Sequence, residues 1–181
     1  MHSRDILTTR LLLVASKVEH LLAELANPTR LEESLGVKVP AGWPPGLYDQ
    51  DAIRFFLTKT QEGGPDIIGW LGWYAIRRAT ETEEPVLVGN GGYVGPPAAD
   101  GVVEIGYSMV PDERRKGYAT EIVNALVQRA FEDPRVRHVV AEVHEENHAS
   151  LQVMARTGFG RIGPGRDEGH WRFQYRRQRD V

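Results

Sequence analysis

Apolar residues recur with two different periods along this chain, and the two periods predict a mixture of strands and helices. Short runs that alternate, or that are continuously apolar and bounded by turn residues, indicate strands. Apolar residues spaced three and four apart indicate helices with one buried face. On this basis we predict strands at residues 9–15, 67–76, 86–94, 102–110, 136–144, 159–163 and 170–176, and helices at 17–26, 49–61, 119–132 and 148–157, with a helical turn at 31–35.

The most informative turn is PDERRKGYA, at residues 111–119. Pro111 ends a strand, and a helical stripe follows at Ala119, Ile122, Val123, Leu126 and Ala130. Arg115, Lys116 and Gly117 therefore lie at a helix N-terminus, where free N–H groups and the helix dipole favour an anion. A basic glycine turn alone is a weak signal. Because Gly-Lys-Ser/Thr is absent, the turn gives no support to a Walker-type nucleotide site.

A second candidate feature is a carboxylate in the middle of the strand predicted at residues 102–110. Alternation places Glu104 on one face with Gly106 and Ser108, two very small residues. That face leaves room for a ligand, so Glu104 is the most interesting carboxylate of the chain. The alternative is an ordinary exposed sheet residue.

Two other features, a glycine-rich strand and a loop tryptophan, can be interpreted either as functional or as purely structural. Gly89, Gly91 and Gly92 suggest a dinucleotide fingerprint, but position 94 is Val94 and no helix pattern follows. Trp43 lies in a loop rich in proline and glycine and is either an aromatic of the substrate side or a plug that packs the loop onto the core.

Composition narrows the class of protein. The 181 residues suffice for one domain, with residues 1–8 as a loose start, and the net charge of −3 gives no field for nucleic acid. The absence of cysteine excludes disulfides and thiolate chemistry and fits a cytoplasmic protein. No apolar run is long enough to span a membrane. The histidines show no spacing typical of a metal site, so we expect no metal.

Three motifs together resemble the GNAT superfamily of N-acetyltransferases, over residues 9–175. They are Arg114-Arg115-Lys116-Gly117-Tyr118-Ala119, Glu104-Ile105-Gly106-Tyr107, and a helix that starts with Asn147-His148-Ala149-Ser150 and closes on Gly158-Phe159. The last two are similar to the subgroup that includes ribosomal-protein alanine N-acetyltransferases.

The resemblance implies an α/β (α+β) fold with a mixed, mostly antiparallel sheet of about six to seven strands and helices on both faces. The strands at 102–110 and 136–144 would splay apart to hold acetyl-CoA between them. The resemblance assigns the cofactor contacts to the backbone of Met109 and Val110, to the turn residues Arg115, Lys116, Gly117, Tyr118, Ala119 and Thr120, and to Asn147 and Ser150.

The resemblance also implies direct transfer of an acetyl group from acetyl-CoA to a primary amine. Glu104 is then the candidate base, with His144 and Glu142 as the second choice. The N–H of Val110 would polarise the thioester carbonyl. Many family members carry a Tyr seven residues after the Asn as general acid, and this position is Met154 here. Proton donation would fall to Ser150, to a water, or to no group at all.

The acceptor is the least defined partner. We expect its site, for either a protein N-terminus or a small amine, to be shaped by four parts of the chain: Trp43, the helix at 49–61, Trp73 or Trp70, and the segment 142–146 with Glu142 and His144. Three alternative hypotheses for the function stay open: a non-catalytic acyl-CoA binding module, transfer of another acyl chain, and transfer to a hydroxyl. Exposed strands are also compatible with a homodimer.

Overall fold

A single eight-stranded sheet organises the computed structural model, which describes residues 5–176. The strand order is β1-β2-β3-β4-β5-β6-β8-β7. The strands are β1 (Ile6–Leu7), β2 (Leu11–Ala15), β3 (Gly72–Arg77), β4 (Val86–Tyr93), β5 (Val102–Met109), β6 (His138–His144), β7 (Phe159–Pro164) and β8 (His170–Tyr175). The helices are α1 (Val18–Ala26), α2 (Pro28–Leu35), α3 (Gln50–Gly63), α4 (Tyr118–Phe131) and α5 (His148–Arg156), with 3-10 turns η1 (Gly64–Ile67) and η2 (Pro111–Glu113).

The sheet opens at one point, between β5 and β6. Every other neighbouring pair is antiparallel, whereas β5 and β6 run parallel and pair only from Val102↔His138 to Glu104↔Val140. Beyond Glu104 the two strands diverge, which leaves that side of β5 without a ladder partner. The predicted separation of these two strands is confirmed.

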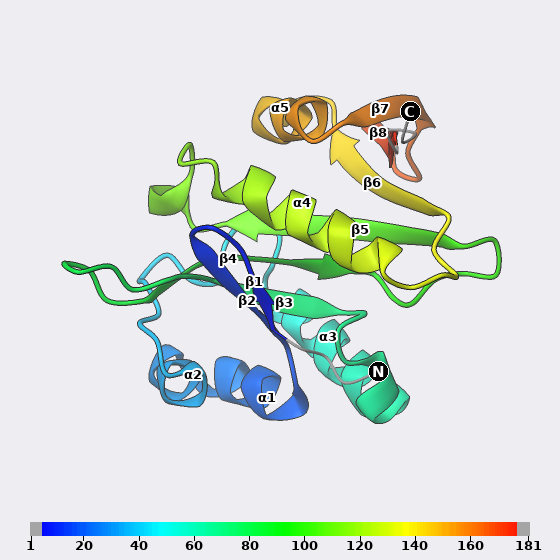
Figure 1. The fold of residues 1–181 in the computed structure, drawn as a ribbon. Coiled ribbons are helices and arrows are strands. Elements are labelled where there is room, and N and C mark those ends of the chain that lie inside the picture. Colours follow the sequence, from blue (N-terminus) through cyan, green and yellow to red (C-terminus); the bar gives the residue numbers. More distant parts are fainter. Residues whose placement is uncertain (1–4, 177–181) are drawn as a thin grey trace.

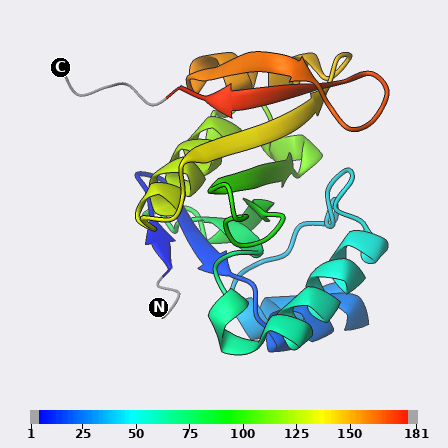
Figure 2. The ribbon, with the colours of Figure 1, turned by 90° about the vertical axis from the view of Figure 1, so that its right-hand side faces the viewer.

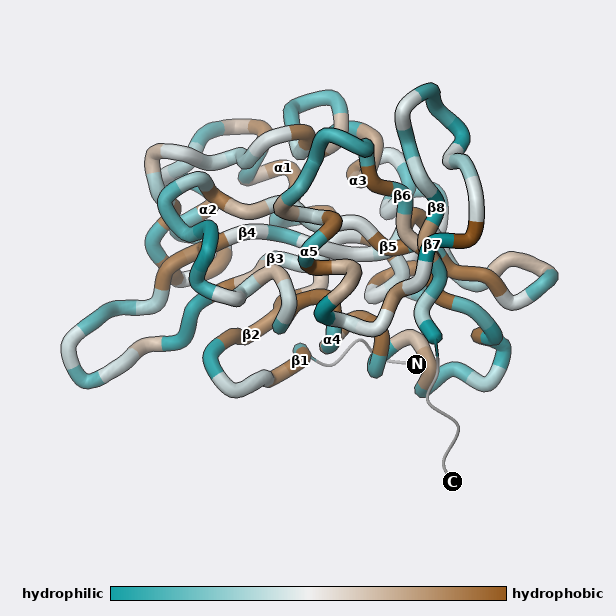
Figure 3. Tube along the Cα trace, turned by 90° about the horizontal axis from the view of Figure 1, so that it is seen from above, coloured by the Kyte–Doolittle hydropathy of each residue, from teal (hydrophilic) through white to brown (hydrophobic). Residues whose placement is uncertain are grey.

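Helices cover both faces of the sheet (Figure 1). The α4 and α5 helices lie on one face, where Val103, Ile105 and Met109 of β5 join the main core. The α1, α2 and α3 helices cover the other face and form a second apolar cluster around Leu21 and Ile53. Figure 3 shows that the apolar stretches run along the strands and that the outer loops are mostly hydrophilic. The α/β class and the mixed, mostly antiparallel sheet are thus as predicted.

The N-terminal prediction needs correction. Ile6 and Leu7 form β1 and pair with Leu13 and Leu12, so this part of residues 1–8 is not loose. Residues 1–4 lie outside the described part of the chain. The short β1 strand accounts for the eighth strand, one more than the sequence pattern predicts. The predicted 67–76 strand begins only at Gly72, because residues 64–67 form the η1 turn.

Candidate active site

The turn before α4 has the geometry of an anion-binding helix N-terminus. Gly117 caps the helix with a φ of 84°, and no side chain bonds to the first N–H groups. Arg115 also has a positive φ, of 61°, which is unusual for a residue with a side chain. The amides at the start of α4 are therefore left for a ligand, next to the arginines of the same turn.

A residue from the bend between β1 and β2, far away in sequence, contacts this turn. The Arg10 guanidinium donates through Nη1 to the Lys116 carbonyl at 2.8 Å and through Nε to Glu121 at 2.8 Å, and it stacks over the Tyr118 ring at 4.6 Å. Burial raises the pKa of Glu121, but the bonds from Thr8 and Arg10 outweigh it, so the pKa lies below its ordinary value. Sequence reasoning missed Arg10, since it lies more than 100 residues from its partners.

A cleft of about 790 Å³ runs from this turn along the open side of β5 to α5. Eight of the predicted cofactor residues line it: Met109, Arg115, Gly117, Tyr118, Ala119, Thr120, Asn147 and Ser150. The described residues that line the cleft include three arginines and one carboxylate: Arg114, Arg115, Arg156 and Glu113. The cleft is therefore positively charged on balance, as a phosphate-bearing ligand requires.

Two predicted cofactor residues do not line this cleft. Lys116 instead forms an ion pair with Glu113 at 2.9 Å. The Val110 N–H donates to the Val88 carbonyl at 3.0 Å, and the Val110 side chain is buried in the second cluster. Since that N–H already has a partner, the prediction that it polarises a thioester carbonyl is wrong.

A second cavity, of about 340 Å³, lies between β4, β5 and α3. Its floor includes Asn90 and Gly106, and Phe56 of α3 forms part of its wall. The two cavities share four lining residues: Tyr107, Ser108, Arg114 and Asn147. They therefore meet at the point where β5 leaves β6, which joins the phosphate-binding end to a smaller chamber.

Glu104 is held by an arginine that the sequence did not reveal. Arg166, in the β7–β8 loop, forms an ion pair with Glu104, and its Nε lies 3.2 Å from Glu142. In Figure 2 this loop extends on the same side of the molecule as the loop that precedes α3. The Glu104 side chain is 16% exposed, and neither cavity includes it among its walls.

Glu142 and His144 are less available than predicted. Burial raises the pKa of Glu142, but the Arg166 N–H and the charges of Arg166 and Arg172 outweigh it, so the pKa lies below its ordinary value. The His144 Nδ1 accepts the Glu146 N–H at 3.2 Å. In neutral His144 this bond puts the proton on Nε2 and leaves no free lone pair. His144 also stacks edge-on with His170, with 5.0 Å between ring centroids.

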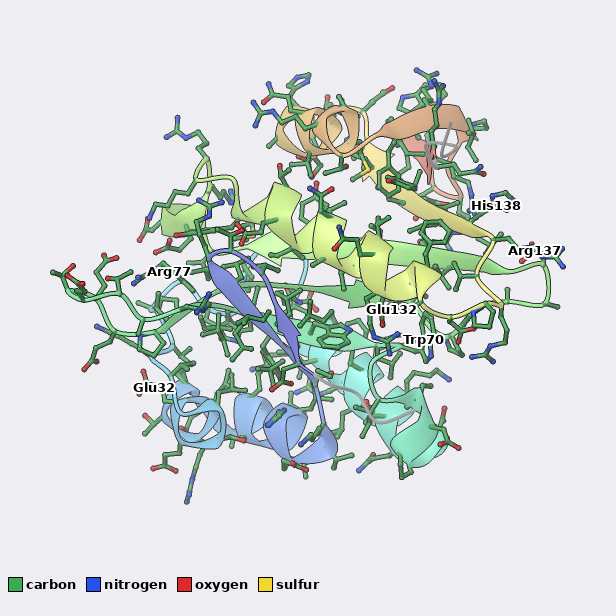
Figure 4. The ribbon with its side chains drawn as sticks, in the orientation of Figure 1. Glu32, Trp70, Arg77, Glu132, Arg137 and His138 are labelled. Carbon is green, nitrogen blue, oxygen red and sulfur yellow. The ribbon has the colours of Figure 1, made fainter. Side chains whose placement is uncertain are left out.

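The predicted tryptophans are core residues. Trp43 is 8% exposed and donates through Nε1 to Glu24 at 2.7 Å, which supports the alternative of a packing plug. Trp73 is 1% exposed and donates to the Gly69 carbonyl. Trp70 packs against Tyr93 near the end of α4 that is remote from Gly117 (Figure 4). None of the three lines either cavity.

Tyr107 and Asn90 are two further site residues that sequence reasoning missed. Tyr107 was part of a motif, but only the structure shows that its hydroxyl is buried without a hydrogen-bond partner of good geometry among the described residues. The Asn90 Oδ1 atom is in the same state. An amide in a glycine-rich strand could have signalled Asn90. Met154 is fully buried in the main core and so takes no part in the cleft.

Within residues 5–176, no group of three or more His, Asp or Glu side chains is arranged to hold a metal ion. No helix in this part of the chain has the length and apolar character needed to cross a bilayer.

A helix end with free amides beside two diverging parallel strands is the arrangement expected of an acyl-CoA-dependent transferase. The Acetyltransferase (GNAT) domain family matches residues 10–160, so the chain belongs to the GNAT acetyltransferase family and is an acyltransferase. A Bacillus subtilis protein, the uncharacterized N-acetyltransferase YjdG, is 24% identical over 91% of this chain and 94% of its own length.

Two solved structures share the fold. A Vibrio cholerae protein, provisionally described as a ribosomal-protein-serine acetyltransferase, has a TM-score of 0.62 and 20% identity over 96% of this chain and 97% of its own. The aminoglycoside acetyltransferase AAC(6')-Ib, solved with coenzyme A, has a TM-score of 0.59 and 20% identity over 92% of this chain and 95% of its own. Acetyl-CoA is thus the expected acyl donor.

Proposed function

We propose that the protein transfers an acetyl group from acetyl-CoA to a primary amine by direct attack. The observation that carries this proposal is the junction of two cavities at Tyr107, Ser108, Arg114 and Asn147. The larger cavity suits the phosphates and extended arm of coenzyme A, while the smaller is open to a second reactant. Acetyl-CoA is consumed in the reaction and is a substrate rather than a resident cofactor.

The cofactor end is supported by backbone chemistry. The free amides of Tyr118, Ala119 and Thr120 face the pyrophosphate in this proposal, with Arg115 supplying charge. The open side of β5, beyond Glu104, offers unpaired backbone groups to the pantetheine amides, which replaces the predicted role of Val110. Asn147 uses its Oδ1 to cap α5, which leaves its amide NH₂ for the pantetheine arm.

The acceptor amine must lose a proton before it attacks, because it is charged at neutral pH. Glu104 lies on the same face of β5 as Gly106, which lines the smaller cavity, and two residues along a strand span roughly 7 Å. We assign Glu104 as the base, acting through a water after Arg166 moves aside. Ser150, at the start of α5, is one of the hydroxyls that line the coenzyme side of the site.

The acceptor belongs to one of two classes. A protein N-terminus is supported by the resemblance to ribosomal-protein acetyltransferases, and a small amine by the modest size of the second cavity. That cavity has no carboxylate in its lining, and Arg114 is its one charged lining residue. A polycation is therefore a poor fit.

The test compares the wild type with Glu104→Gln, using release of the coenzyme A thiol with alaninamide and propylamine as amine probes. We expect turnover to fall about 100-fold with little change in acetyl-CoA affinity, as for loss of a general base. The difference should narrow as the pH approaches the amine pKa, since the amine then arrives deprotonated. The exposed Glu62→Gln is the matched control. Equal turnover of Glu104→Gln and wild type across this pH range would remove Glu104 from the mechanism.

A further inference from the structure

The Tyr107 hydroxyl differs from three other buried tyrosine hydroxyls of the described chain, each of which donates a hydrogen bond. Tyr48 and Tyr74 donate to Glu24, and Tyr93 donates to the Leu126 carbonyl at 2.6 Å. Among the described residues, no group meets hydrogen-bond geometry with the buried Tyr107 Oη, and the Ser150 side chain is the one neighbour whose hydrogen bonding opposes the rise in its pKa caused by burial. A buried donor left unpaired loses its hydrogen bonds to water without replacement and destabilises the fold, so such a group requires an explanation.

The position of this phenol suggests what its partner is. Tyr107 is one of the four residues that line both cavities, and Ser150, another hydroxyl of the coenzyme side, lies close enough to influence it. If the proposed function holds, the bond exchange occurs where the two cavities meet. The partner of the phenol is then an atom of the reacting thioester.

The thiol leaving group is the atom with the strongest need for a donor. The amine lone pair forms the new C–N bond, the C–S bond breaks, and its electron pair leaves on sulfur as the coenzyme A thiolate. The amine gives up two protons in all, one before attack and one from the adduct, and these pass to Glu104 and to water. The thiolate later takes one proton from solvent.

We propose that Tyr107 is a catalytic residue that donates a hydrogen bond to the departing sulfur. Tyr107 would supply the donor to the leaving group. Position 154 does not supply one, because Met154 has no O–H or N–H group and is fully buried in the core. The phenol comes from β5 and not from the helix that follows the cofactor Asn. This proposal rests on the proposed function, which supplies the thioester at the junction.

The environment of Tyr107 favours a hydrogen-bond donor over a proton donor. Burial raises its pKa above the ordinary value of 10.0, with a smaller opposing effect of Ser150. A thiol has an ordinary pKa of about 8.5, so proton transfer from this phenol to a thiolate is uphill. A phenol that stays protonated can still stabilise developing charge, as donors of an oxyanion hole do.

The first test measures the sulfur directly and needs no acceptor. Coenzyme A bound to the wild type and to Tyr107→Phe is titrated by its thiolate absorbance. We expect the pKa of the bound thiol to be about 1 unit higher in Tyr107→Phe, since one hydrogen bond to the charged form is lost. Tyr175→Phe, which removes a phenol outside both cavities, should match the wild type.

The second test measures turnover with hydroxylamine as a small acceptor that is uncharged at pH 7. Tyr107→Phe should lower kcat about 30-fold while acetyl-CoA affinity stays within about 2-fold. Equal thiol pKa values in the two proteins would overturn the role of Tyr107 even if the wild type acetylates amines. Failure of the wild type to bind coenzyme A at all would instead overturn the proposed function, and the role of Tyr107 with it.

Discussion

The two halves of the proposed site, one for acetyl-CoA and one for the acceptor, are built in different ways. The cofactor half is mainly backbone: the turn through Gly117, the first amides of α4 and the open edge of β5. The acceptor half consists mainly of side chains from distant segments. Phe56 and Asn90 line the smaller cavity, and the ion pair of Arg166 with Glu104 belongs to the same half. A backbone site depends on local conformation, whereas a side-chain site depends on packing.

This difference has consequences for how each half tolerates substitution. In the cofactor half, a side chain added at the turn disturbs the conformation that presents the amides. In the acceptor half, a side chain added to the floor changes the volume and shape of the chamber. Substitutions in the two halves should therefore separate acetyl-CoA affinity from acceptor use.

The largest expected effect is on the cofactor half, from Gly117→Val. Gly117 has a φ of 84°, which strains a β-branched residue, and an added Cβ would lie 3.2 Å from the Arg10 guanidinium. We expect acetyl-CoA affinity to fall about 100-fold, close to 2.8 kcal/mol. Isothermal titration measures this directly.

Gly95→Ala is the matched control for Gly117→Val. A Cβ at position 95 meets no atom within 4 Å, and the position lines neither cavity. This variant should bind acetyl-CoA as the wild type does. If Gly117→Val binds acetyl-CoA as tightly as the wild type does, the turn does not hold the phosphates. The claim that the cofactor half is built from backbone groups would then be wrong.

The same contrast explains what the sequence could predict. Gly117 and Asn147 were predicted correctly as helix caps because each signal is confined to a few neighbouring residues. The pairing of Arg166 with Glu104 spans 62 residues in sequence and follows from the placement of the β7–β8 loop, which no local pattern reveals.

The errors have the same origin. Val110 was misassigned because its N–H bonds to Val88, a pairing set by the register of β4 and β5. The tryptophans at 43 and 73 were misassigned because burial of an aromatic ring depends on tertiary packing. The strand and helix predictions were mostly right, since they rest on periodicity and on helix-end chemistry, and most of the predicted cofactor residues line the larger cleft.

The next effect concerns the acceptor half, from Gly106→Val. A Cβ at position 106 meets no atom within 4 Å, so the added side chain fits the fold and occupies part of the smaller cavity. We expect kcat/KM for alaninamide to fall about 30-fold, near 2 kcal/mol, with acetyl-CoA affinity unchanged. Steady-state kinetics and titration of acetyl-CoA check the two halves separately.

Gly106→Ala gives a graded control, because a single methyl group takes less of the chamber. It should lie between the wild type and Gly106→Val in kcat/KM. If Gly106→Val weakens acetyl-CoA and leaves the acceptor kinetics unchanged, the smaller cavity is not the acceptor site and the assignment of the two halves is wrong.

The smallest effects compare one carboxylate from each half, in Glu121→Gln and Glu142→Gln. Glu121 bonds to Arg10 beside the α4 turn, and Glu142 bonds to Arg166 and Arg172 beside Glu104. Each loses charge-assisted bonds, so each variant should be less stable by about 1.5 kcal/mol at pH 7. Glu121→Gln should mainly weaken acetyl-CoA binding, and Glu142→Gln should mainly raise the acceptor KM.

The pH dependence of these two losses has a definite sign. The pKa values of Glu121 and Glu142 lie below their ordinary value of 4.5 in the folded protein, so the carboxylates stabilise the fold above pH 4.5. That contribution is lost as the pH falls through the folded pKa, where wild type and variants should converge in urea unfolding. If the difference in free energy of unfolding between wild type and variant persists unchanged well below pH 4, Gln disturbs the packing. The loss of stability would then not come from the charges of Glu121 and Glu142.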